Sequence, residues 1–194
     1  PPWLPTSPRL LMNKLENFSQ DVEFLENHTR TIVLTSPDGK AQIAIAPDLQ
    51  GRVMTSTCQG GSGHSFGWIN YNLFKKGIQP VDQREGLEAH VYAFGGEERL
   101  WLGPEGGQFS LYFSPESPNY DFEHWITPEV LNTEAFDIAP QSDQQVRFTK
   151  STTLINKAGT SLQMEICRDV TLLDHTSIAN LLDATLDPSL NAVA

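Results

Sequence analysis

The feature that most constrains the fold is a pair of β-rich runs late in the chain, Arg147–Ile155 and Leu162–Leu173. The four residues Asn156-Lys157-Ala158-Gly159 lie in the turn region between them and end in glycine, which is typical of a hairpin turn. In the second run the even-numbered residues are apolar except for Arg168, so they share one face of a strand. The pattern predicts a long β-hairpin with one buried face.

Earlier in the chain, short β-rich runs recur between turn signals. The clearest turn is Ser36-Pro37-Asp38-Gly39, which predicts a hairpin between the first two runs. Many short strands with little helix favour a sandwich or barrel. The further predicted strands are Thr31–Leu34, Ala41–Ala46, Arg52–Thr57, Val91–Phe94, Arg99–Leu102, Phe109–Phe113 and Phe136–Ile138, and Phe66–Tyr71 reads as a short strand or a loop.

The two ends differ from this pattern. Residues 1–12 contain four prolines and predict an extended arm, and residues 13–194 read as one β-sandwich domain. Apolar spacing from Leu15 to Leu25 predicts one short helix, with Asn13 and Glu16 as its N-terminal capping pair. Residues 187–194 resemble a turn and an uncompleted apolar strand, so we expect a chain truncated at its C-terminus whose exposed sheet edges favour a homo-oligomer.

Charge narrows the range of partners. The chain carries a net charge of -11 and its basic residues are scattered, which argues against nucleic acid and against an anionic membrane surface. No apolar run is long enough for a membrane span. Cys58 and Cys167 show no metal-ligand spacing, so they read as two small buried side chains, or as a disulfide should their strands be neighbours.

The densest functional signal is the segment from Tyr92 to Phe109. If residues 97–103 are extended, Glu97, Arg99 and Trp101 share one face of a strand. An indole ring and charged groups on one face suit a sugar, because the ring packs on C–H groups and the charges bind hydroxyls. The same spacing also fits a surface ion pair of Glu97 with Arg99 and a core position for Trp101.

Three motifs resemble a family of uncharacterised bacterial proteins of the DUF6786 type, placed in the galactose mutarotase-like superfamily. They are Gly51-Arg52-Val53-Met54-Thr55-Ser56-Thr57, Ser65-Phe66-Gly67-Trp68-Ile69-Asn70-Tyr71 and the block from Gly95 to Phe109. The resemblance runs from about residue 15 to the end of the chain. It implies an all-β supersandwich, of which this chain is an N-terminal portion, with a ligand site on a concave face. The ligand-binding residues it implies are Arg52, Trp68, Asn70, Arg99 and Trp101, together with the carboxylates Glu97 and Glu105.

Aldose 1-epimerases of that superfamily open the sugar ring with a histidine acid and a glutamate base. The best histidine here is His124, beside Trp125, although it also fits a surface or packing role. The epimerase histidine motifs are not found. Glu97, Glu105 and His124 are therefore the predicted catalytic residues, and a hydrolase or lyase that uses paired carboxylates is the rival enzyme class.

The sequence thus predicts a carbohydrate-binding protein, with aldose 1-epimerase-like isomerisation as the leading chemistry. The alternative is a non-catalytic module for glycan recognition or assembly. No cofactor and no metal ion are expected. The compartment is not fixed by the sequence, which favours a periplasmic or secreted location over a cytoplasmic one.

Overall fold

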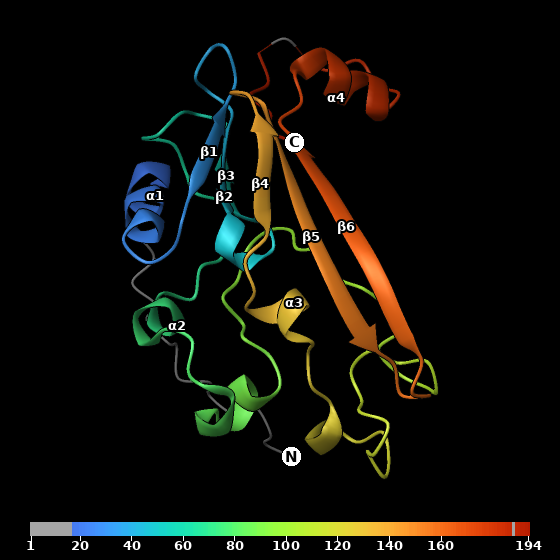
Figure 1. Ribbon diagram of the computed structural model, residues 1–194. Coiled ribbons are helices and arrows are strands. Elements are labelled where there is room, and N and C mark those ends of the chain that lie inside the picture. The colour runs from blue at the N-terminus through green and yellow to red at the C-terminus, as the bar shows by residue number, and fades with distance from the viewer. Residues whose placement is uncertain (1–16, 188) are drawn as a thin grey trace, which may run out of the picture.

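The computed structural model describes residues 17–187 and 189–194, and in this part the chain is rich in β-structure (Figure 1). Three-stranded antiparallel sheets form from β1-β2-β3 and from β4-β5-β6. The strands are β1 (Ile32–Thr35), β2 (Gln42–Ala46), β3 (Arg52–Thr57), β4 (Asp137–Gln141), β5 (Gln145–Ile155) and β6 (Ser161–Thr171). Short helices α1 (Phe18–Glu26), α2 (Tyr71–Lys76), α3 (Glu129–Asn132) and α4 (His175–Leu181) accompany them, so the all-β description is too narrow.

Helix α1 begins later than the sequence pattern suggests. Its N-cap is Asn17, whose side chain accepts a hydrogen bond from the backbone of Gln20, while the Gln20 side chain accepts one from the backbone of Asn17. This reciprocal pair satisfies two backbone donors that a helix start leaves free. The predicted capping residues Asn13 and Glu16, and the predicted arm 1–12, lie outside the described residues.

The first sheet confirms the early hairpin. Strand β1 pairs with β2 from Ile32↔Ile45 to Thr35↔Gln42, and β2 continues the sheet onto β3. Four successive β2 residues, from Ile43 to Ala46, are buried. Such a run indicates a strand covered on both faces. One face packs under α1 and α2 through Ala44 and Ala46, and the other packs toward the second sheet.

The second sheet confirms the late hairpin over its full length. Strands β5 and β6 pair from Gln145↔Thr171 to Ile155↔Ser161. The predicted alternation also holds, since even-numbered β6 residues are more buried than their neighbours and Val170 is buried. Strand β6 is at the edge of this sheet. Cys167 points outward and is a free thiol, as is Cys58, so neither the disulfide nor the buried reading of Cys167 holds.

Three predicted strands are wrong. Residues 91–94, 99–102 and 109–113 are irregular, and this part of the chain joins sheet structure only at the isolated bridges Val53↔Glu98 and Ile69↔Gly95. Gly95 and Gly96 have φ values of 94° and 108°, which no extended strand contains. The alternating apolar residues instead reach separate parts of the core, with Tyr92 and Phe94 under α2 and Tyr112 beside the second sheet.

Other corrections fall at the ends of elements. Of the two alternatives for residues 66–71, the loop is confirmed, and it leads into α2 at Tyr71. Helix α4, which the sequence pattern missed, starts at an Asp174 side chain that accepts a hydrogen bond from the backbone of Ser177. Residues 189–194 form no strand, although the backbone of Leu173 donates to the carbonyl of Ala194 at 2.9 Å.

The two sheets meet where Gly51 packs on Phe148 of β5. Gly51 has a φ of 66°, and a β-carbon added there would lie 2.4 Å from the Phe148 ring. Phe148 is fully buried and lies opposite Arg168 in the β5–β6 register. Only a glycine allows this approach, so residue 51 sets the distance between the first sheet and β5.

Replacing Gly51 with alanine should lower the free energy of unfolding by about 2 kcal/mol, through left-handed strain and the ring clash together. Gly159→Ala is the matched control, because its φ is 81° but nothing lies within 4 Å of the added carbon. That variant should lose only about 1 kcal/mol. Equal losses in urea denaturation of the two variants would show that the approach to Phe148 carries no cost.

Candidate functional site

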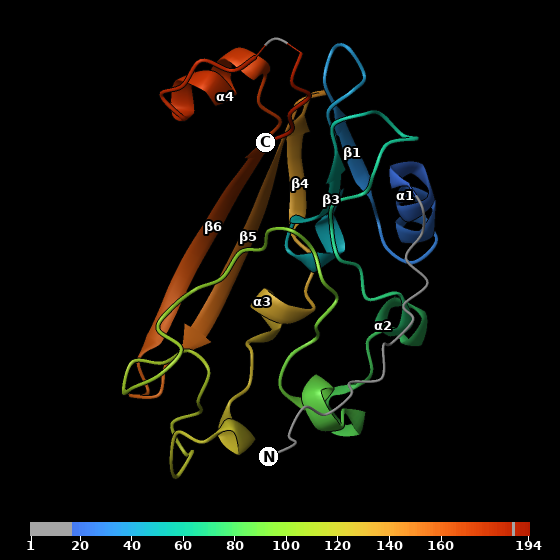
Figure 2. The same ribbon diagram turned by 180° about the vertical axis from the view of Figure 1, so that it is seen from behind.

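The candidate site is organised by residues 95–105, which leave the first sheet and cross to the second. At the start, the Glu97 backbone donates to Val53 at 2.9 Å, and the Val53 backbone donates to Glu98 at 3.1 Å. Figure 2 shows this green segment passing over the face of β5 and β6. The segment therefore borders the space between the two sheets.

A pocket of about 390 Å³ lies in that space, and we call it the inter-sheet pocket. Its apolar lining includes Ile43, Val53 and Val170, and its charged lining consists of Glu97, Glu98, Arg168 and Asp169. Ligand pockets are typically apolar clefts of about 300–1,000 Å³ with a few convergent polar groups. This pocket has that character and the size of a site for a small ligand.

The two glutamates are held in different ways. Glu97 accepts hydrogen bonds from the Ser56 backbone at 2.8 Å and from the Ser56 hydroxyl. Glu98 forms a two-point ion pair with Arg168, in which Nη1 donates to Oε1 at 3.0 Å and Nη2 donates to Oε2. Arg168 Nε also donates to the carbonyl of Gly51 at 3.3 Å. Only 12% of the Arg168 side chain is exposed against 52% of Glu98, so the arginine is the fixed partner.

Arg52 lies buried behind residues 95–98. Its guanidinium donates to the carbonyl of Gly95 at 3.0 Å and to the side chain of Gln50 at 3.3 Å, while Nε has no acceptor among the described residues. Burial, reinforced by repulsion from Arg99, lowers the pKa of Arg52 to about 9. At 1% exposure the side chain cannot contact a ligand in this state.

Arg99, Trp101 and Glu105 come together in a second place, the aromatic stack. The guanidinium carbon of Arg99 lies 4.3 Å from the centre of the Trp101 ring, and the indole N–H donates to Glu105 at 2.5 Å. Trp101 stacks on Tyr112 at 5.2 Å, and Tyr112 stacks on Trp125 at 5.2 Å. Burial lowers the pKa of Arg99 and raises that of Tyr112. Trp101 is half-buried, with both an arginine and a tyrosine already in contact.

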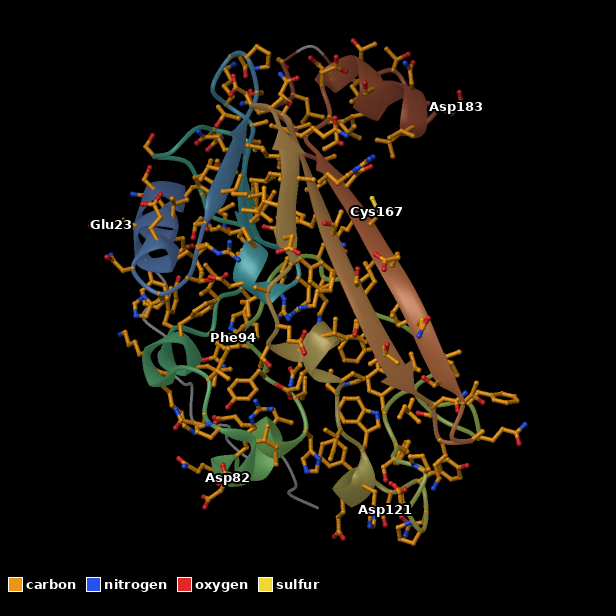
Figure 3. The ribbon with its side chains drawn as sticks, in the orientation of Figure 1. Glu23, Asp82, Phe94, Asp121, Cys167 and Asp183 are labelled. Carbon is orange, nitrogen blue, oxygen red and sulfur yellow. The ribbon has the colours of Figure 1, made fainter. Side chains whose placement is uncertain are left out.

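The remaining predicted residues lie elsewhere. Asn70 caps α2, where its side chain accepts from Leu73 and donates to Ala93. Trp68 is 49% exposed on the loop before α2. His124 pairs with Asp121 at 2.5 Å, and this hydrogen bond lowers the pKa of Asp121. Figure 3 places Asp121 near the lower end of the molecule and Cys167, the residue before Arg168 of the pocket, well above it on β6.

The structure thus divides the predicted residues. It brings Arg99, Trp101 and Glu105 into contact, but Glu97 is held by Ser56, because residues 97–103 do not form the assumed strand. The predicted catalytic residues Glu97, Glu105 and His124 have three different partners and form no common cluster.

Sequence reasoning missed Glu98 and Arg168 as a pair. A signal for Arg168 was present, because it is the one charged residue on the apolar face of β6. A charge on a buried face requires a partner, and β6 alone offers none. What the sequence could not provide was the identity of that partner, which is 70 residues away along the chain.

Within residues 17–187 and 189–194, no three His, Cys, Asp or Glu side chains are placed to hold a metal ion. No helix in that part is long and apolar enough to cross a membrane.

Comparison with known proteins gives one match. No curated protein and no solved structure is similar to this chain. The match is a family of unknown function (DUF6786), whose sequence model covers residues 16–194. That range contains both sheets and every residue of the inter-sheet pocket and the aromatic stack. The chain belongs to the DUF6786 family.

Proposed function

We propose that this protein binds a carbohydrate in the inter-sheet pocket. The observation that carries the proposal is the convergence of Glu97, Glu98 and Arg168 on an apolar pocket of about 390 Å³. Sugars present hydroxyl groups around a ring whose C–H faces are apolar. Carboxylates accept hydrogen bonds from hydroxyls and a guanidinium donates to them, and bonds with a charged partner are about twice as strong as neutral ones.

Isomerisation of an aldose, of the mutarotase type, is the reaction that fits this proposal best. It requires an acid and a base that reach the ring oxygen and the anomeric hydroxyl. Glu97 is the candidate base because it lines the pocket and its position is fixed by Ser56. No histidine is among the described residues that line the pocket, so His124 is not part of this proposal. The proposed wider architecture is a supersandwich, to which both sheets would contribute.

A second candidate is a glycan-recognition module without catalysis, and the aromatic stack favours it. The stack continues from Trp125 to Phe122 at 5.9 Å, and Phe122 is 57% exposed. Exposed rings of this kind can pack against the C–H face of a sugar. This candidate uses a different surface, so variants of the two places separate the two functions.

Replacing Glu97 with glutamine should weaken sugar binding about tenfold, because a charged acceptor becomes a neutral one. Binding is measured by calorimetry against a panel of common aldoses and their disaccharides. Glu165→Gln is the control, since Glu165 is an exposed β6 carboxylate hydrogen-bonded to Ser151 outside the pocket.

Polarimetry of a freshly dissolved aldose then tests the isomerisation. A rate above that of buffer, reduced in Glu97→Gln, supports the mutarotase-type reaction. Binding that depends on Phe122 and ignores Glu97 would favour the recognition module. An absence of binding to every sugar in the panel would refute the proposed function.

A further inference from the structure

We infer that the ligand of the inter-sheet pocket is an acidic sugar, whose carboxylate pairs with Arg168 in place of Glu98. This inference rests on the proposed function and specifies its substrate class. It is carried by the geometry of the Arg168 guanidinium and by the exposure of Glu98.

Among the charged residues that line the pocket, Arg168 is the arginine, and Glu97, Glu98 and Asp169 are the carboxylates. Two carboxylates of the pocket already have arginine partners: Glu98 pairs with Arg168, and Asp169 pairs with Arg147 at 2.6 Å. Glu97 accepts hydrogen bonds from Ser56. Arg52 is buried near Glu98 and Arg168, whose charges act on it, so a further guanidinium lies behind the pocket wall.

Arg52 and its neighbour Arg99 form no ion pair with a carboxylate of the described residues. Arg52 donates to a carbonyl and to an amide oxygen, and Arg99 donates to the carbonyl of Leu131. The Nε atoms of both side chains are buried without an acceptor. Gly96 holds this layer close, because a β-carbon at that residue would lie 2.9 Å from Cδ of Arg52. A buried charge without a partner is costly, and an anion bound nearby offsets that cost.

Arg168 is built to receive such an anion. Its Nε is anchored on Gly51, so the two Nη atoms present a fixed fork at the pocket wall. A fork of this geometry binds a planar carboxylate through two parallel hydrogen bonds. Glu98 now fills it, but the Glu98 side chain is 52% exposed, so a ligand carboxylate can approach from solvent and replace it without leaving the guanidinium unpaired. Glu98 thus occupies the position that a ligand carboxylate would take.

The test compares D-glucuronate, D-galacturonate, D-glucose, D-glucosamine and glucose 6-phosphate by calorimetry with the full chain at low salt. We expect a uronate to bind at least about tenfold tighter than D-glucose. Glu98→Gln should tighten uronate binding about three- to tenfold, because it removes both a competitor and a negative charge. Arg168→Gln should weaken it more than about tenfold.

Controls separate these effects from altered folding and from general charge. Glu165→Gln removes one negative charge from the same strand outside the pocket and should leave the affinity unchanged. Arg168→Lys keeps the charge but loses the fork, so it should bind uronate nearly as poorly as Arg168→Gln. Thermal unfolding followed by circular dichroism confirms that each variant is folded.

Several results would overturn the inference. Equal affinity for D-glucose and for both uronates, with no effect of Arg168→Gln, would leave sugar binding intact but reject the acidic class. Tighter binding of D-glucosamine would show that the carboxylates govern recognition. Tighter binding of glucose 6-phosphate than of either uronate would show that the anion bound by Arg168 is a phosphate and not a carboxylate. Weaker uronate binding in Glu98→Gln would show that Glu98 contacts the ligand directly.

Discussion

Replacing Phe148 with alanine should lower the free energy of unfolding by about 4 kcal/mol, the largest effect that we expect from a single substitution here. Phe148 is fully buried in β5 and belongs to the core cluster that joins the two sheets. Its removal leaves a cavity beneath Gly51, where a rigid backbone cannot collapse to fill it. Urea denaturation followed by tryptophan fluorescence measures the change.

The same substitution should also weaken ligand binding. Phe148 lies opposite Arg168 in the β5–β6 register, and Gly51 contacts both residues. A looser contact at this point frees the guanidinium that lines the pocket. Phe109→Ala is the control, because Phe109 is 56% exposed and should change stability by less than about 0.5 kcal/mol. A loss below about 1 kcal/mol for Phe148→Ala would mean that the sheets do not pack in solution as described.

The parts of the fold that the sequence predicts correctly are those where pairing is local. The β5–β6 hairpin joins strands across a short turn, so alternation and turn residues carry the whole signal. Strand β3 was predicted with its observed bounds, Arg52–Thr57, because Gly51 marks its start. Each of these elements forms hydrogen bonds with a neighbour close in sequence, and local patterns describe such neighbours well.

The segment from residue 91 to residue 113 was predicted wrongly for the opposite reason. Its apolar residues alternate as in strands, yet they pack against elements that are distant in sequence. The Tyr92 hydroxyl accepts a hydrogen bond from the backbone N–H of Gln79, and the Arg99 guanidinium donates one to the carbonyl of Leu131. Gly95 and Gly96, with positive φ values, turn the chain directly before residue 97. Periodicity cannot separate a strand from an irregular segment that alternates its side chains between two cores.

The residues of the candidate site were also predicted only in part. Glu97 was recognised because charge, glycine and tryptophan concentrate around it, and it lines the pocket. Arg52 was expected to line a ligand site, but it is buried one layer behind the wall. Its burial comes from the isolated bridge between Val53 and Glu98, which no local pattern announces. How deeply a side chain is buried depends on tertiary contacts, which the residue types in a sequence do not reveal.

The buried position of Arg52 has a meaning for function as well as for stability. Burial lowers the pKa of Arg52 to about 9, which means that the charged form is disfavoured at this depth. Such a residue is not explained by packing, since an apolar side chain of similar size would be cheaper. An anion in the pocket in front of it reduces that cost.

Replacing Trp101 with alanine should lower the free energy of unfolding by about 3 kcal/mol while leaving uronate binding in the inter-sheet pocket within about threefold of the original. Trp101 packs against the main core cluster, stacks on Tyr112 and lies under the Arg99 guanidinium. The substitution removes all of these contacts together with the hydrogen bond to Glu105. Because the indole is engaged by the protein itself, its main contribution should be to stability.

Trp68→Ala is the matched control for Trp101→Ala. The Trp68 indole is 49% exposed, so its loss should change stability by about 0.5 kcal/mol or less. Chemical denaturation and calorimetric titration of both variants give the two required readouts. Sugar binding that is abolished in folded Trp101→Ala, and retained in Glu97→Gln and Arg168→Gln, would move the ligand site from the inter-sheet pocket to the aromatic stack. Binding that instead follows Glu97 and Arg168 would assign Trp101 to the framework that holds residues 95–105 across the two sheets.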